Sequence, residues 1–167
     1  LVTLGTFLLW FGWFGFNGFS QLAMGTFDDV NAISKIAVNT HLAGAAGTVA
    51  GAAITRLMAG KTDIVMMLNG ALAGLVAITA EPLTPSPLLA ILIGFVGALI
   101  MYFGTKFLES LQLDDVVGAI PVHMFAGIFG TLVVPASNPD TNFGTQFLGV
   151  ISVLSLIHIS EPTRRSM

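Results

Sequence analysis

Apolar positions in this chain fall in long runs that are separated by short polar turns. A helix needs about 20 apolar residues to cross a bilayer core of about 30 Å, and most of these runs have about that length. The pattern predicts five membrane-spanning helices and the beginning of a sixth. Their expected ranges are 1–24, 30–58, 64–80, 88–108 and 118–134, and then Phe143 to about Leu154.

The charged residues between the runs predict an orientation, because basic residues accumulate on the cytoplasmic side of a membrane. The second and fourth junctions carry Arg56, Lys61 and Lys106. The other junctions are acidic, with Asp28, Asp29, Glu81 and Asp140. We therefore expect the chain to begin at the cytoplasmic face, with the acidic turns outside.

Composition supports a membrane protein. Of the 167 residues, 54% are hydrophobic and 9% are charged, and the mean hydropathy is +0.89. A soluble domain carries about 25% charged residues. The net charge of -3 gives no reason to expect a nucleic-acid partner, and the absence of cysteine excludes disulfides and thiolate metal sites. The first residue, Leu1, lies inside an apolar run, so we interpret the chain as a piece of a longer protein.

Small residues recur at the spacing that lets transmembrane helices approach closely. Gly44, Gly47 and Gly51 share one face of the second span, Gly70 and Gly74 form a GxxxG motif, and Gly127 and Gly130 follow in the fifth span. These glycines predict a tight helix bundle. They do not by themselves indicate a function.

The first span ends in the aromatic stretch WFGWFGFNGFS, from Trp10 to Ser20. On a helix, Trp13, Phe16 and Ser20 fall within an arc of about 60°. One reading is an aromatic belt at the membrane interface. Such belts do not usually run through the middle of a span and end on an amide and a hydroxyl, so we favour a functional face.

Two histidines lie inside spans. His123 follows Pro121 in the fifth span, and an ionisable group inside a span indicates function by default. His41 lies in the second span beside Ala45 and Thr48, on the small-residue face, where we expect a packed histidine without a functional role.

A metal-dependent membrane enzyme is an alternative, because carboxylates and an imidazole bind several divalent ions. Glu109, Asp114, Asp115 and His123 are the candidates. His123, however, would lie about 12 Å deeper in a helix than Asp115, and the two aspartates more plausibly cap the fifth helix. No Ser-His-Asp arrangement, phosphate loop or pair of catalytic carboxylates occurs in the spans. We therefore expect no enzyme activity, cofactor or metal.

Two segments make the sequence similar to a known family. GWFGFNGFS resembles the sixth-helix signature of the ammonium transporter (Amt/Mep/Rh) family, and DDVVGAIPVHMFAGIFGTL, residues 114–132, resembles its tenth-helix signature. VNTHLAGAAG and LNGALAGLVAITA look like the seventh and eighth helices. The resemblance implies an all-α, polytopic transmembrane bundle in which two five-helix halves form inverted repeats. This chain would be the second repeat and the start of the last helix.

The resemblance also implies roles for single residues. Ser20 matches the hydroxyl of the external ammonium site, Phe16 a gate phenylalanine, Trp13 an aromatic deeper in the pore, and His123 the second of twin pore histidines. The other pore groups, including the first histidine, would belong to the half that this sequence lacks. Phe19 departs from the glycine that the family usually has before the site serine, so the outer vestibule could differ in shape.

At the level of the whole protein, the resemblance implies transport of ammonium or ammonia by a multi-pass homotrimer in the cell membrane. A signalling protein of the PII type would be a further partner on the cytoplasmic side. A Rhesus-type channel for neutral gases is the alternative within the family. Residues 1–153 would form the partial transmembrane domain.

The last stretch, LSLIHISEPTRRSM, breaks the sixth apolar run with charged residues and a proline. A helix would not carry these residues at that depth in a bilayer. The stretch resembles translated sequencing adapter. We expect residues 154–167, including His158, not to be native.

Overall fold

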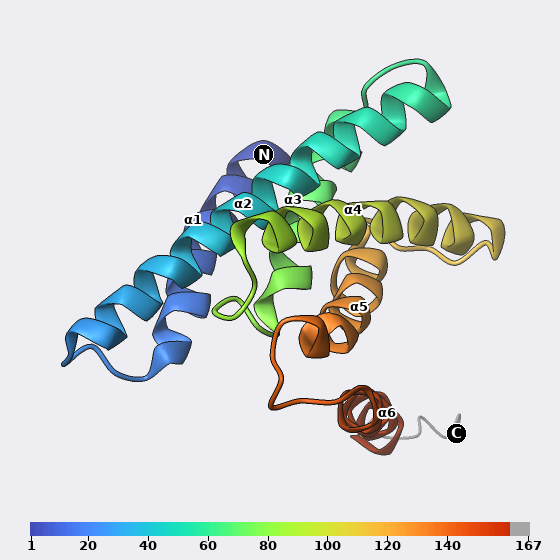
Figure 1. Ribbon diagram of the computed structural model, residues 1–167. Helices are drawn as coiled ribbons and strands as arrows, with labels where there is room; N and C mark the ends of the chain where they lie inside the picture. The colour runs from blue at the N-terminus through green and yellow to red at the C-terminus, as the bar shows by residue number, and fades with distance from the viewer. Residues whose placement is uncertain (161–167) are drawn as a thin grey trace.

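The computed structural model describes residues 1–160, and side chains to residue 156, and every regular element in this range is helical (Figure 1). This confirms the all-α fold class. The long helices are α1 (Val2–Gly18), α2 (Phe27–Ala59), α3 (Ile64–Thr79), α4 (Pro87–Ser110), α5 (Ala126–Val133) and α6 (Phe143–Ser160). The short ones are η1 (Phe19–Gln21), η2 (Ile120–Phe125) and η3 (Val134–Ala136). The His158 side chain and residues 161–167 lie outside the described residues, so the expectation of a non-native tail stays a prediction.

The helices α2, α3 and α4 agree with the expected spans, whereas the first and fifth spans differ from the prediction. The first span was expected to reach Met24, but α1 ends at Gly18, and Leu22 then adopts a left-handed backbone (φ 59°). The fifth span is not one regular helix. It begins as the π-helical turn η2, continues as α5 and ends as the 3₁₀ turn η3. Pro121 lies in the first turn of η2, where a backbone N–H has no intrahelical partner, so the proline is tolerated there.

Glycines bring α2, α3 and α4 into close backbone contact. A β-carbon at Gly51 would lie 2.8 Å from the Met66 carbonyl oxygen, and one at Gly70 would lie 2.6 Å from the Gly47 carbonyl oxygen. A β-carbon at Gly94 of α4 would overlap the Ala43 backbone even more closely. The expected tight bundle is confirmed, and any larger side chain at these positions would separate the helices.

The remaining helices are placed around this centre. α1 packs on α2 and α3, and η2 and α5 pack on α3 and α4. α6 contacts α5 and lies apart from α1 to α4 (Figure 1). This arrangement leaves α1, α3 and α5 around a shared space.

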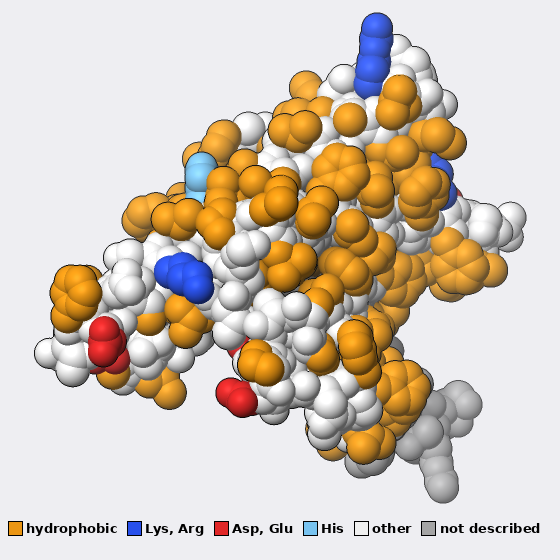
Figure 2. Space-filling view, viewed as in Figure 1, with side chains coloured by type: hydrophobic (Ala, Val, Ile, Leu, Met, Phe, Trp, Pro, Cys, Tyr) orange, Lys and Arg blue, Asp and Glu red, His pale blue; other side chains and the backbone are white. Residues whose placement is uncertain are grey.

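The outer surface is apolar. Large hydrophobic side chains such as Phe7, Val49 and Phe103 are exposed, and hydrophobic side chains cover much of the face in Figure 2, with the charged ones sparse. Among the described residues, α2 and α4 are long and apolar enough to cross a membrane, and Ile64–Thr79, Ile120–Ala136 and Phe143–Leu156 are shorter apolar helices. A surface of this kind suits contact with lipid.

Hydrogen bonds join the two loops at the acidic end of the bundle. Asn39 on α2 donates through Nδ2 to the carbonyl oxygens of Pro82 and Pro85, at 2.9 Å each. Glu81 accepts from Asn138 Nδ2 at 2.9 Å. The loop after α3 is thereby held to α2 on one side and to the loop after η3 on the other, and this fixes the end of α3.

Candidate functional site

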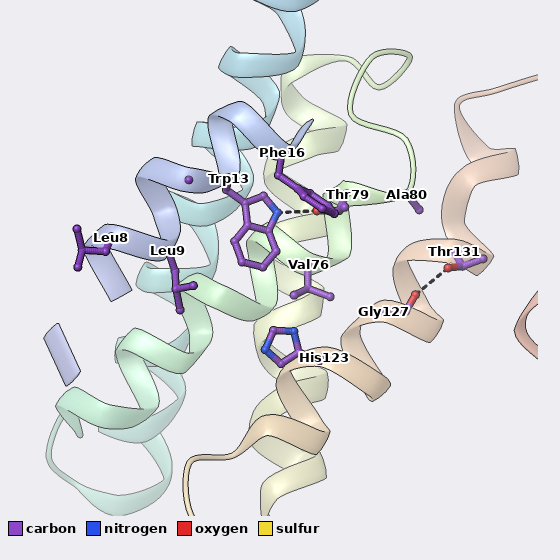
Figure 3. A pocket seen from close by; sticks show the side chains of 11 residues that line it. Leu8, Leu9, Trp13, Phe16, Val76, Thr79, Ala80, His123, Gly127 and Thr131 are labelled. Carbon is purple, nitrogen blue, oxygen red and sulfur yellow. Dashed lines mark hydrogen bonds between the residues drawn. The ribbon is translucent and has the colours of Figure 1, made fainter. Parts of the chain in front are cut away.

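A cavity of about 660 Å³ lies between α1, α3 and the η2–α5 segment (Figure 3). Three of the four candidate residues, Trp13, Phe16 and His123, line it. The other lining residues are Leu8, Leu9, Gly12, Val76, Thr79, Ala80, Gly127 and Thr131. Side chains from distant parts of the sequence therefore meet at one apolar space with few polar groups, as is typical of small-molecule sites.

The aromatic face of α1 forms one wall of this cavity. The ring centroids of Trp13 and Phe16 lie 6.2 Å apart with their planes at 62°, an edge-to-face pair. Trp13 Nε1 donates a hydrogen bond of 2.7 Å to Thr79 Oγ1 on α3. Phe16 remains 66% exposed. Trp13 and Phe16 of the aromatic stretch therefore face a cavity.

The backbone before His123 is held by a carboxylate. Asp115 accepts hydrogen bonds from the backbone N–H groups of Ala119 (2.9 Å) and Ile120 (2.8 Å). Gly118, which lies between Asp115 and Ala119 in the sequence, has a left-handed backbone (φ 74°). A β-carbon at this position would lie 2.8 Å from Asn69 Nδ2. Of the two aspartates expected to cap this span, Asp115 does so.

His123 itself lies in the π-helical turn η2, and its side chain is exposed. It lines the main cavity and also a second one of about 440 Å³, which α6 borders through Gly149 and Val150. Single π-helical turns occur often at functional sites. The imidazole is thus open to two spaces in this chain.

Ser20 lies outside the cavity wall. It belongs to η1, it is exposed, and its hydroxyl donates to the Phe16 carbonyl oxygen at 3.0 Å. Ser20 follows Phe16 by one helical turn and lies at the end of the aromatic face of α1. The expected set of four residues is therefore a group of three around the cavity with one hydroxyl outside it.

The expected packing of His41 is wrong. Its side chain is exposed, and it does not lie on the buried face that carries Gly44 and Gly47. The imidazole ring lies 5.6 Å from the Trp10 ring and 6.2 Å from the Phe14 ring, nearly parallel to the latter. The aromatic residues of α1, rather than small residues of α2, surround it.

Sequence reasoning missed two hydroxyls of the cavity, those of Thr79 and Thr131. Each stands near the end of an apolar span, and threonine is common there, so the sequence carries no strong signal for either. The hydroxyls become visible as site residues only when α3 and α5 are placed against α1.

Within the part of the chain that the structure describes, no three His, Asp or Glu side chains gather as a metal site would require. Both oxygens of Asp115 accept backbone N–H groups instead. The residues weighed as a metal site are therefore not brought together.

A model of the Ammonium Transporter Family matches residues 1–149, nearly the whole described chain. The chain belongs to this family. It is 50% identical over 131 residues to the ammonium transporter Amt2 of Archaeoglobus fulgidus, which covers 78% of this chain and 27% of the relative. It is 41% identical over 155 residues to a putative ammonium transporter of Synechocystis, covering 90% of this chain and 35% of that relative.

Solved structures agree with the family assignment. A sensor Amt protein superposes with a TM-score of 0.84 at 35% identity, over 92% of this chain and 40% of that protein. Mep2 of Candida albicans superposes with a TM-score of 0.82 at 26% identity, over 92% of this chain and 37% of that protein. The resemblance seen in the two sequence signatures is thus confirmed, and this chain spans a quarter to two fifths of the length of these relatives.

Proposed function

We propose that the protein to which this chain belongs moves ammonium or ammonia across a membrane, through a pore of which the chain forms one wall. The observation that carries the proposal is the cavity lined by Trp13, Phe16 and His123. The relatives named above as ammonium transporters support the substrate.

The physical problem for such a protein is dehydration. Removing a cation from water costs far more than the roughly 2 kcal/mol that a desolvated aromatic contact returns. The cavity wall is largely apolar, so a bare cation is not stable there. The mechanism that resolves this transfers a proton from ammonium to a basic group or to water in the pore, and lets neutral ammonia cross the dry part near His123.

Roles follow from position along the wall. Ser20 is the hydroxyl at the outer entrance, Phe16 with its exposed ring is the gate residue next to it, and Trp13 lines the space between Phe16 and His123. His123 is the polar stepping point, because a neutral imidazole has one donor and one acceptor nitrogen. The exposed faces of Phe16 and His123 meet the half of the protein outside this sequence.

The same proposal includes the assembly. The full protein is a multi-pass protein of the cell membrane, a homotrimer with one pore in each subunit. The basic end of the bundle, near Arg56 and Lys106, faces the cytoplasm, where a signalling protein of the PII type would bind. Residues 1–153 are the native part of the transmembrane domain.

The direct test compares the full-length protein with this chain alone, each expressed in cells that lack ammonium uptake. We expect the full-length protein to restore growth on low ammonium. Residues 1–153 alone should not, because the cavity would be open to lipid on one side. Growth with the short chain, or no growth with a full-length protein present in the membrane, would contradict the proposal. Current recordings would then separate charged from neutral transport.

Two substitutions in the full-length protein separate the gate from the entrance. Phe16→Ala should lose selective uptake, because it removes the ring that blocks water. Ser20→Ala should weaken uptake only modestly, because a single hydrogen bond contributes about 1 kcal/mol. Uptake at several ammonium concentrations, normalised to protein in the membrane, measures both. Equal losses in the two variants would argue against separate roles.

A further inference from the structure

The two hydroxyls of the cavity wall are both turned back onto their own helices. Thr79 Oγ1 donates to the Leu75 carbonyl oxygen at 2.6 Å, and Thr131 Oγ1 donates to the Gly127 carbonyl oxygen at 3.0 Å. A hydroxyl has one proton to donate. Each of these side chains therefore presents only acceptor capacity to its other neighbours.

The indole of Trp13 uses that acceptor capacity. Trp13 Nε1 lies 2.7 Å from Thr79 Oγ1, and the bond joins residues on α1 and α3 that both line the cavity. Thr79 is half-buried, and the donor direction of its hydroxyl is fixed by the Leu75 carbonyl. The chain of bonds runs from the indole to the hydroxyl and then to the backbone of α3. Figure 3 shows the first of these two bonds.

We propose that Thr79 is a positioning residue that also sets selectivity: its hydroxyl occupies the indole N–H of Trp13 and holds the ring as a wall between Phe16 and His123. The inference rests on the proposed transport function. Buried tryptophan N–H groups usually find a partner, and here that partner is a side chain whose own proton is already committed. Trp13 therefore turns an apolar ring toward the cavity and offers it no free donor.

This arrangement discourages water along the part of the cavity wall that Trp13, Thr79 and Thr131 form. A water molecule is held in a protein interior when it finds two to four polar partners. With the indole N–H and both threonine protons engaged, these three side chains offer a water molecule no proton. A water molecule has two lone pairs that need donors, ammonia has one and ammonium has none, so a wall without donors leaves water with the most unsatisfied groups and disfavours it more than the substrate.

Thr79→Val tests this in the full-length protein. Valine keeps the shape of threonine but removes the Oγ1 acceptor. The Trp13 indole can then rotate away from this position, or its N–H can bind a water molecule. We expect uptake at low ammonium to fall about tenfold, as for the loss of one buried hydrogen bond. Osmotic water permeability of proteoliposomes should rise. Thr79→Ser restores the hydroxyl and should recover most of both properties.

A spectroscopic readout keeps the test independent of transport. The ¹⁵N-indole NMR signal of Trp13, assigned as the one missing in Trp13→Phe, should shift in Thr79→Val and return in Thr79→Ser. Thr48→Val is the matched control, because Thr48 also donates to the carbonyl four residues before it, Gly44 at 2.9 Å, on α2 and away from the cavity wall. It should leave signal, uptake and water permeability at their wild-type values.

The outcomes are distinguishable. An unshifted Trp13 signal in Thr79→Val, or Thr79→Ser behaving like Thr79→Val, overturns the assignment of Thr79. Unchanged water permeability in Thr79→Val overturns its role in selectivity. If the valine variant does not fold, Thr79→Ala, which also lacks the hydroxyl, replaces it. A wild-type protein that takes up no ammonium would instead defeat the transport proposal, while the NMR signal still reports on the indole bond.

Discussion

His123→Ala in the full-length protein is expected to fold and assemble, and to lose selective ammonium uptake by up to about 100-fold. The side chain borders a cavity rather than the packed centre of α2, α3 and α4, so its removal enlarges an existing space and leaves that centre intact. What it removes is a polar group in an apolar space, and with it the hydrogen bond to the twin histidine that the family resemblance implies. An orphaned buried partner costs about 1 to 3 kcal/mol, which corresponds to about 5- to 150-fold.

The matched control for this variant is His41→Ala. His41 is also a histidine within a span, but it faces Trp10 and Phe14 and does not line the cavity. It should keep wild-type uptake. Uptake is measured with each variant normalised to protein in the membrane. Wild-type selectivity in His123→Ala, or equal losses in both variants, would refute the role of His123.

The spans and their close packing could be predicted from the sequence, because they depend on bilayer thickness and on the spacing of glycines. A bilayer fixes the length of an apolar run, and the starts and ends of α2, α3 and α4 lie within three residues of the expected ones. Glycine spacing predicted close helix packing, and the structure shows that this packing joins α2 and α3, where only a residue without a β-carbon permits the approach. Both signals lie in the local sequence.

The candidate site could be predicted only in part, because its geometry depends on contacts between segments that are distant in the sequence. The motif named Trp13, Phe16 and His123, and these line one cavity. It did not reveal that Thr79 holds Trp13, which depends on how α1 lies on α3. The predicted environment of His41 was wrong for the same reason. A helical wheel gives the face of one helix, but it does not say which neighbour covers that face.

The π-helical turn at His123 is a further feature that could not be predicted from the sequence. A run of apolar residues after Asp115 predicts a continuous helix, and Pro121 at the start of a helix is compatible with one. In the structure, a π-helical turn follows Gly118 in a left-handed conformation, and Asp115 accepts the N–H groups of Ala119 and Ile120 at its start. An extra residue in one turn changes which side chain faces the cavity, so the sequence alone does not orient His123.

Gly47→Ala is expected to destabilise the bundle strongly. A β-carbon at Gly47 would overlap the Gly70 carbonyl and lie 3.2 Å from the Gly74 Cα. Both obstacles are backbone atoms of α3, so they cannot move away as a flexible side chain would. Overpacking costs about 1 to 3 kcal/mol and sometimes more, and we expect about 3 kcal/mol here. The free energy of unfolding, measured by denaturant titration of the full-length protein in detergent, checks this.

The control for Gly47→Ala is Gly5→Ala, for which we expect the opposite sign. Gly5 is inside α1, and within the described chain no neighbouring atom lies within 4 Å of a β-carbon placed there. Alanine favours a helix over glycine by up to about 1 kcal/mol, so Gly5→Ala should leave stability unchanged or raise it. The same intrinsic gain acts at Gly47, and the overlap with α3 must exceed it. If the two variants have the same stability, close approach of α2 and α3 is not what holds the centre of the bundle together.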